Sequence, residues 1–317
     1  MPGIAPRLTE QGDGITAIDT DLIRPYFDAS HLIVDNGRAA FVDTGVNSSV
    51  PLLLATLAAK NIDVADVDYV LLTHVHLDHA GGAGLLMRSL PNAVAVLHPR
   101  GAPHMIDPAK LIKGAQAVYG EEEYFRQYGD ILPIEERRVA IATDGEEFRV
   151  GNRALMSVYT EGHARHHHCF ADPASRAVFT GDSFGLSYRE LDTEHGEFIY
   201  PTTTPVHFDP PEAHKAIERI MSFEPRQVFL THYSKVVDLE RLADDMHRRI
   251  DDFVRIARQH ADADNRTAMI HEHMYAYFVD ELRKHGFAGS AAEIREFVGK
   301  DVVLNTMGLE FWLDHSP

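Results

Sequence analysis

The chain has 317 residues, of which 44% are hydrophobic and 25% are charged, as is usual for a globular protein. A chain of this length builds a core that needs no disulfide or structural metal to hold it together. The net charge of −18 would repel a polyanion such as DNA or RNA. We therefore expect a small-molecule substrate and no nucleic-acid partner.

Two further features of the sequence concern location. Cys169 is the single cysteine, which excludes an internal disulfide and fits a reducing compartment. The first residues lack the basic start and apolar run of a signal peptide, and no stretch reaches the length of a membrane span. We expect a cytoplasmic protein with no membrane partner.

The first part of the chain predicts a few short strands and then an alternation of helices and strands. Apolar and β-branched residues predict strands at 15–19, 27–34 and 38–43. Next come a helix at 51–60, a buried strand at 68–73, a helix that ends at residue 89, a strand at 93–98 and helices within 108–128. This order indicates sheets that are covered by helices.

The middle of the chain predicts a second set of strands, at 137–142, 148–150, 154–159, 168–171 and 177–180. A helix at 211–223 and a last strand at 227–231 follow. Residues 188–209 are rich in Thr, Pro and His and show no period. Because this segment is long for a structureless connection, it favours a functional loop.

The chain changes character after residue 237. Residues 238–260 and 266–285 have helical spacing with many i,i+4 charge pairs, and a shorter helix is expected from Ser290. We divide the chain into a first domain at 1–237 and a helical C-terminal extension at 238–317. Two roles for the extension stay open, a cap over a pocket and a homodimer contact.

Four strong metal ligands follow the buried strand at 68–73, namely His74, His76, Asp78 and His79. In an extended segment His74 and His76 project the same way, whereas Asp78 and His79 come as the chain turns and face a second ion. A His-rich polar loop is the plainer interpretation. However, such a cluster after an apolar strand is costly to desolvate unless it is paired or coordinated.

Three later strand ends each supply one more ligand. His163 follows the strand at 154–159, Asp182 follows 177–180, and His232 follows 227–231. Converging strand ends build one site from distant parts of a sequence. Imidazole and carboxylate ligands together suit zinc, iron or manganese, so the seven residues predict a metal centre.

This ligand set resembles the signature of the metallo-β-lactamase superfamily, H-x-H-x-D-H followed by separate His, Asp and His, over about the first three quarters of the chain. Within the superfamily it is similar to the glyoxalase II and lactonase-like branch. It implies an α/β (α+β) fold, the four-layer αββα sandwich, at 1–237, with the site at one edge and the helical extension behind it.

The resemblance also implies two divalent metal ions, with Zn2+ favoured over Fe or Mn. The first ion would be held by His74, His76 and His163, and the second by Asp78, His79 and His232, with Asp182 between them. Asp43 matches a position that supports the ligands from behind. A turn-initiating aspartate before Gly45 explains that residue equally well.

Hydrolysis of a small ester, lactone, thioester or related acyl compound is the chemistry that the resemblance implies. A water shared by two ions has its pKa lowered from about 15.7 to about 7, and the resulting hydroxide attacks the acyl carbon. Asp78 and Asp182 are the catalytic residues expected to orient it. His167 and Tyr233 are weaker candidates for supporting the site or touching the substrate.

An oxidoreductase is the alternative. Persulfide dioxygenases share these ligand types but use one iron, so metal content and oxygen uptake separate the two functions. No motif in the C-terminal helices matches the basic contacts of hydroxyacylglutathione hydrolases, which puts glutathione thioesters in doubt. β-Lactam hydrolysis is disfavoured because we see no export signal.

Overall fold

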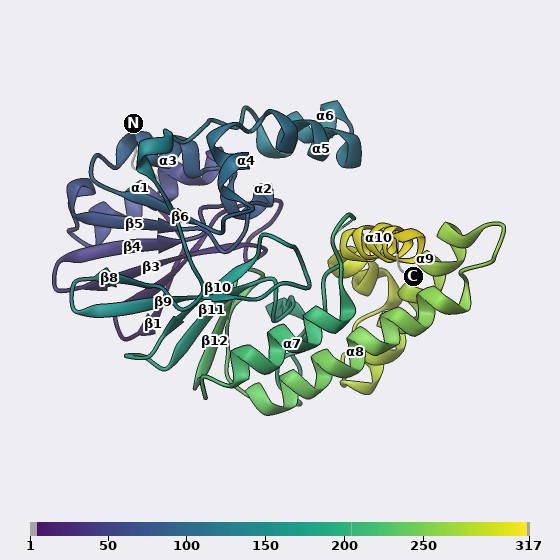
Figure 1. Ribbon diagram of the computed structural model, residues 1–317. Helices are drawn as coiled ribbons and strands as arrows, with labels where there is room; N and C mark the ends of the chain where they lie inside the picture. The colour runs from purple at the N-terminus through teal and green to yellow at the C-terminus, as the bar shows by residue number, and fades with distance from the viewer. Residues whose placement is uncertain (1–4, 204, 316–317) are drawn as a thin grey trace.

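A computed structural model, which describes residues 5–203 and 205–315, shows two β-sheets with helices on their outer sides (Figure 1). The first sheet has seven strands in chain order: β1 (Leu8–Gly12), β2 (Ile15–Asp19), β3 (Ala29–Asp35), β4 (Arg38–Val42), β5 (Val67–Leu71), β6 (Val94–Leu97) and β7 (Val139–Ile141). Strands β1 to β4 pair antiparallel, and β4 to β7 pair parallel.

The second sheet has the strand order β13-β12-β11-β10-β9-β8. Its strands are β8 (Glu147–Val150), β9 (Arg153–Tyr159), β10 (His168–Asp172), β11 (Ala177–Gly181), β12 (Gln227–Leu230) and β13 (Ser234–Val236). Within it β11 and β12 pair parallel, with Gly181 opposite Leu230, so these two strands end at the same edge. That register places the residues which follow both strands next to each other.

Helices cover each sheet from outside (Figure 1). Those between the strands of the first sheet are α1 (Val50–Ala59), α2 (Leu77–Ala80), α3 (Ala83–Ser89), α4 (Ala102–Ile106), α5 (Ala109–Tyr119) and α6 (Glu121–Tyr128). Those beside the second sheet are α7 (Pro210–Met221), α8 (Leu239–Gln259), α9 (Arg266–Lys284) and α10 (Ala291–His315). Short 3-10 turns occupy Asn47–Ser49, Val64–Asp66, Glu136–Arg138 and Arg189–Leu191.

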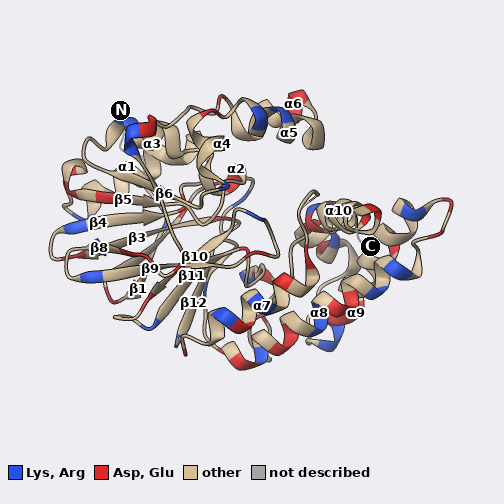
Figure 2. Cartoon of the chain, viewed as in Figure 1, with Lys and Arg blue, Asp and Glu red and all other residues tan. Residues whose placement is uncertain are grey.

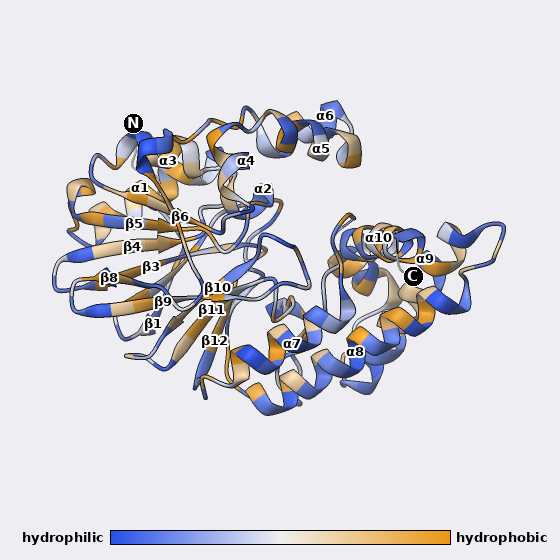
Figure 3. Cartoon of the chain, viewed as in Figure 1, coloured by the Kyte–Doolittle hydropathy of each residue, from blue (hydrophilic) through white to orange (hydrophobic). Residues whose placement is uncertain are grey.

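Burial of apolar strand faces holds the layers together. Ile33 and Leu71 of the first sheet share a core with Phe170 and Phe229 of the second, and all four are almost completely buried. Figure 3 shows the apolar residues along the strands, and Figure 2 shows the charged ones concentrated on α7, α8 and α9. Removing this apolar surface from water is the main force that stabilises the sandwich.

The predicted αββα sandwich with C-terminal helices is confirmed. The prediction of a short helix from Ser290 is wrong, because α10 has 25 residues. Gly299, Gly308 and several β-branched residues lower its intrinsic helix propensity, but burial of Val298 and Val302 outweighs that cost. The strands β1 and β13 at the sheet edges were not predicted, since their sequences are short and polar.

The helices α8, α9 and α10 pack into the same core as the second sheet. Phe253 and Phe278 from these helices belong to one buried cluster with Val178 and Val228 of the strands. The division of the chain at residue 237 stays a prediction. No helix among the described residues is long and apolar enough to cross a membrane.

Candidate metal centre

The seven predicted ligands lie together where strands of both sheets end. His74, His76, Asp78 and His79 follow β5, and the last two stand in the short helix α2. Asp182 and His232 follow the paired strands β11 and β12. His163 lies in the loop between β9 and β10. The convergence that the sequence predicted is therefore present in the fold.

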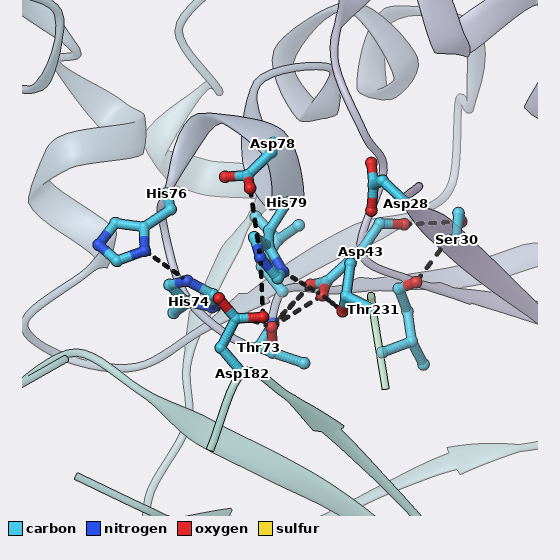
Figure 4. A network of polar contacts seen from close by, with 12 residues as sticks. Asp28, Ser30, Asp43, Thr73, His74, His76, Asp78, His79, Asp182 and Thr231 are labelled. Carbon is cyan, nitrogen blue, oxygen red and sulfur yellow. Dashed lines mark hydrogen bonds and ion pairs between the residues drawn. The ribbon is translucent and has the colours of Figure 1, made fainter. Parts of the chain in front are cut away.

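A first group consists of His74, His76, His163 and Asp182, whose ligand atoms all lie within 4.8 Å of one another. His76 Nδ1 is 2.7 Å from His74 Nε2 (Figure 4). It is also 3.1 Å from His163 Nε2. The carboxylate of Asp182 closes the group, with Oδ2 at 3.4 Å from His163 Nε2. Three imidazoles and a carboxylate at such distances match the coordination number and ligand types of a zinc-like ion.

A second group consists of Asp78, His79 and His232. Asp78 Oδ2 is 3.3 Å from His232 Nε2 and 3.9 Å from His79 Nε2. The other oxygen of Asp182 faces this group, because its Oδ1 is 3.4 Å from His79 Nε2 and 3.8 Å from His232 Nε2. Asp182 therefore presents one oxygen to each group.

Three of the imidazoles are fixed through the nitrogen that points away from the groups. His79 Nδ1 donates to Asp43 Oδ2 at 2.8 Å, His163 Nδ1 donates to the Thr202 carbonyl at 3.0 Å, and His232 Nδ1 donates to the Phe27 carbonyl at 2.9 Å. In the neutral ring each contact places the proton on Nδ1, so that the Nε2 lone pair is available to a metal ion.

Asp43 connects both sheets beneath the ligands. Its carboxylate accepts hydrogen bonds from the Thr73 backbone N–H at 2.8 Å, the Thr73 hydroxyl at 2.8 Å and the Thr231 hydroxyl at 2.9 Å, in addition to His79 (Figure 4). Asp43 is 1% exposed and has a φ of 56°, a conformation that aspartate tolerates better than most residues. It thus orients His79, and the turn interpretation alone does not account for these contacts.

Two buried atoms at the centre fit a bound cation. His79 Nε2 and Asp182 Oδ1 are buried and have no hydrogen-bond partner among the residues that the structure describes. Buried polar atoms without a partner are rare, because leaving them unpaired costs about 1–3 kcal/mol each. Since both atoms belong to ligand types for divalent metals and face each other, the residues present fit a divalent metal site.

The protonation equilibria divide the imidazoles into two sets. Burial lowers the pKa of His76 to about 3, and the neighbouring His163 adds to that shift. Burial also lowers the pKa of His74 and of His163. In His232 burial is outweighed by the carboxylates, Asp182 foremost, and the pKa rises to about 9. His74, His76 and His163 are therefore neutral, the form that binds a metal ion. His232 instead faces the negative charge of the carboxylates.

The two weaker candidates lie in different places. His167 is buried under the first group, stacked on His74 at 4.7 Å between ring centroids, and its Nε2 accepts the Asp182 backbone N–H at 3.3 Å. Tyr233 instead packs against Tyr26 and lines a separate pocket with Lys235. His167 therefore supports a ligand, whereas the side chain of Tyr233 does not face the ligand groups.

A cavity of about 280 Å³ opens onto the ligand groups. His76, Asp78, His163 and Asp182 form its floor. Its other walls include residues that the sequence did not single out as functional, among them Leu111, Val118, His104, His166 and Leu304. Two features of the sequence indicated this wall, the helical periodicity around 108–128 and the functional loop expected at 188–209, which supplies Thr202 and Thr203. Nothing in the sequence linked Leu304 to it.

Comparison with known proteins agrees with this geometry. A family model described as the metallo-beta-lactamase superfamily matches residues 23–232, which is more than half of the chain and includes all seven ligands. The chain belongs to the metallo-β-lactamase superfamily. Members of this superfamily are typically hydrolases, and the His and Asp cluster is of the kind that binds divalent metals.

Among relatives, a metallo-beta-lactamase fold-containing protein of Sulfurisphaera tokodaii is 28% identical over 60% of this chain and 67% of its own length. An atrochrysone carboxyl ACP thioesterase of Aspergillus fumigatus is 30% identical over 49% of this chain. That alignment spans only 36% of the fungal protein. The chain therefore matches only part of the fungal relative.

The fold has close counterparts among solved structures. The crystal structure of an archaeal metallo-beta-lactamase superfamily protein from Sulfolobus tokodaii superposes with a TM-score of 0.67, at 21% identity, over 94% of this chain and 98% of that chain. Coverage of 94% extends beyond the family match, so the shared fold includes most of the C-terminal helices. At this level of identity the likeness concerns the fold alone.

Proposed function

We propose that this protein is a hydrolase that holds two divalent metal ions, most simply Zn2+, and cleaves an ester, lactone, thioester or related acyl compound. The observation that carries the proposal is the arrangement around Asp182, which presents Oδ2 to His163 and Oδ1 to His79 and His232. One carboxylate between two ligand groups can serve an ion in each of them.

His74, His76 and His163 would hold the first ion, and Asp78, His79 and His232 the second, with Asp182 shared. Bound there, the ions would supply an activated water and polarise the acyl oxygen. The carboxylates of Asp78 and Asp182 would orient the attacking water by accepting its hydrogen bonds. Asp43, through His79, would keep the second group in position.

An acyl substrate is supported by two facts. The relative from Aspergillus fumigatus is named a thioesterase, although the match spans only part of it. The cavity above the ligands is lined largely by apolar side chains, which suits the hydrocarbon part of an acyl compound better than a sugar or a nucleotide. We also propose that the protein acts in the cytoplasm on a small molecule, on the grounds of its acidic charge and its single, buried Cys169.

The test combines metal analysis with a substrate panel. Purified protein is assayed for zinc, iron and manganese, and is then given lactones, thioesters, phosphodiesters and a persulfide, with oxygen uptake followed in parallel. The proposal expects hydrolysis of acyl compounds, about two ions per chain, and loss of activity in Asp182→Asn but not in the exposed control Glu194→Gln. One iron with persulfide-dependent oxygen uptake would instead establish the dioxygenase.

A further inference from the structure

The cavity over the metal ligands has one apolar wall, which comes from α5. Leu111, Ala115 and Val118 lie at helical spacing and line the same side. Helix α5 is anchored, because Leu111 and Tyr119 pack against a buried cluster that includes Tyr124, Tyr128 and Leu77. The wall is therefore held in place by the fold. Leu77, which stands between His76 and Asp78, connects it to the ligand loop.

A second wall comes from the C-terminal helix. Leu304 of α10 lines the cavity together with Thr202, Thr203 and Val206. In Figure 1, α5 lies with the helices of the first sheet and α10 with those beside the second sheet. A group seated between these helices would lie over Asp78 and Asp182, which also line the cavity.

We propose that this cavity binds the apolar acyl group of the substrate, a chain or ring of medium size, between α5 and α10. The proposal rests on the function proposed above and specifies its substrate class. Apart from the ligands themselves, Lys110 is the one lining residue with a formal charge among those that the structure describes. A hydrocarbon seated there loses no hydrogen bonds to water, whereas a polar or charged group would find few partners on α5.

The volume bears on the size of the acyl group. A cavity of about 280 Å³ is several times larger than the roughly 30 Å³ that one water molecule occupies in the liquid, so it admits a group of several carbons or a ring. An acetyl group would leave most of the cavity unfilled.

Gly114 gives a direct way to fill the cavity. It lies on α5 among the lining residues, and a Cβ placed on it would meet no atom of the described residues within 4 Å. Three residues after Leu111 and four before Val118, position 114 lies on the helix face that lines the cavity, so Gly114→Leu would add a side chain to that face. The substitution would also favour the helix, since glycine is about 1 kcal/mol less favourable than alanine within a helix. Lys113→Leu is the matched control, because it adds the same side chain at a neighbouring, exposed position that does not line the cavity.

The experiment measures binding of acetate, butanoate, hexanoate and octanoate to the zinc-loaded protein by calorimetry. Affinity is expected to rise about fourfold per added methylene, up to the size that fills the cavity. In Gly114→Leu this gain should be lost beyond butanoate while acetate binding is retained, and Lys113→Leu should behave as the wild type. Circular dichroism and thermal melting show that each variant folds.

Equal affinity across the series, or an unchanged gain in Gly114→Leu, would overturn the proposal. Because the readout is binding of carboxylates, it does not depend on catalysis. Failure of every acyl ester and thioester to be hydrolysed, with the chain-length dependence of binding intact, would refute the proposed function and leave the apolar site standing. Hydrolysis of acyl compounds without a dependence of binding on chain length would support the proposed function and refute the apolar site.

Discussion

The side chain of Asn305 accepts a hydrogen bond from the backbone N–H of Thr203, with 2.6 Å between Oδ1 and N. Both residues are almost completely buried, and the Thr203 hydroxyl also donates to the Asn305 carbonyl at 3.0 Å. The preceding residue, Thr202, accepts the hydrogen bond from His163 Nδ1. The C-terminal helix α10 is thus connected to His163, a candidate metal ligand, through one short loop.

We predict that Asn305→Ala weakens binding of the first metal ion. Without the side chain the loop loses the partner of the Thr203 N–H, and the Thr202 carbonyl no longer holds the ring of His163 in one orientation. Supporting contacts of this kind change metal affinity by roughly 10–100-fold. Zinc titration of metal-free protein against a chromophoric chelator measures the effect.

Thr306→Val is the control for that variant. Thr306 is buried one residue further along α10, and its hydroxyl donates to the Val302 carbonyl within the same helix. Its replacement disturbs the packing of α10 to a similar extent but leaves the loop contacts in place. Equal zinc affinities of the two variants would show that Asn305 acts on the fold in general and has no role in positioning His163.

Asp43→Asn should weaken the second metal site more than the first. The amide preserves the shape of Asp43 and tolerates its positive φ, but it removes the charge that His79 Nδ1 contacts at 2.8 Å. We expect the affinity for the more weakly held ion to fall about tenfold or more, with little change at the other site. Competition titrations that resolve two binding steps would show this. A uniform loss at both steps would mean that Asp43 supports the whole site.

Removal of the metal should destabilise the folded chain. The ligands are buried, and an ion that binds only the folded state at a thousand times its Kd adds about 4 kcal/mol to the free energy of unfolding. For a chain of this length we expect chelation to lower the Tm by roughly 5–10 °C, with full recovery on zinc addition. Asp182→Asn should respond much less to the chelator. An unchanged Tm in the wild type would argue against a tightly bound ion.

Asp301 should make stability depend on pH. Burial raises its pKa from 3.8 to about 6, even though the Tyr200 hydroxyl donates to its carboxylate at 2.8 Å. Because the folded state then holds this proton more tightly than the unfolded state, its contribution is full near pH 4 and is lost as the pH rises through 6. Between pH 4.5 and 7.5 the wild type should lose about 2 kcal/mol relative to Asp301→Asn. Urea unfolding at both pH values measures this change in the free energy of unfolding. An equal change with pH in the wild type and in Asp301→Asn would contradict the prediction.

The grouping of the seven candidate ligands was predictable, because the local sequence shows both their chemistry and their position after strands. The residues from His74 to His79 directly follow an apolar strand, and Asp182 and His232 each follow another strand. Residues that follow converging strands lie close together at the edge of the sheets. The strand order and the role of Asp43 needed the fold, because its contacts with Thr73 and Thr231 join distant segments.

The helical walls of the cavity and the Asn305 contact were not predictable from the sequence. Leu111 and Leu304 are ordinary helical apolar residues, which read as core until tertiary packing shows what they face. The length of α10 was underestimated for a related reason, since its glycines and β-branched residues argue locally against a long helix. Packing of α10 against the helices that precede it stabilises the longer helix.

The central claim is that the seven ligands hold two ions, and equilibrium dialysis of the metal-free chain against zinc, followed by elemental analysis, tests it most directly. We predict saturation at two ions per chain, because Asp182 presents an oxygen to each ligand group. Saturation at a single ion, or no binding above that of a His74→Ala, His79→Ala double variant, would contradict the binuclear site.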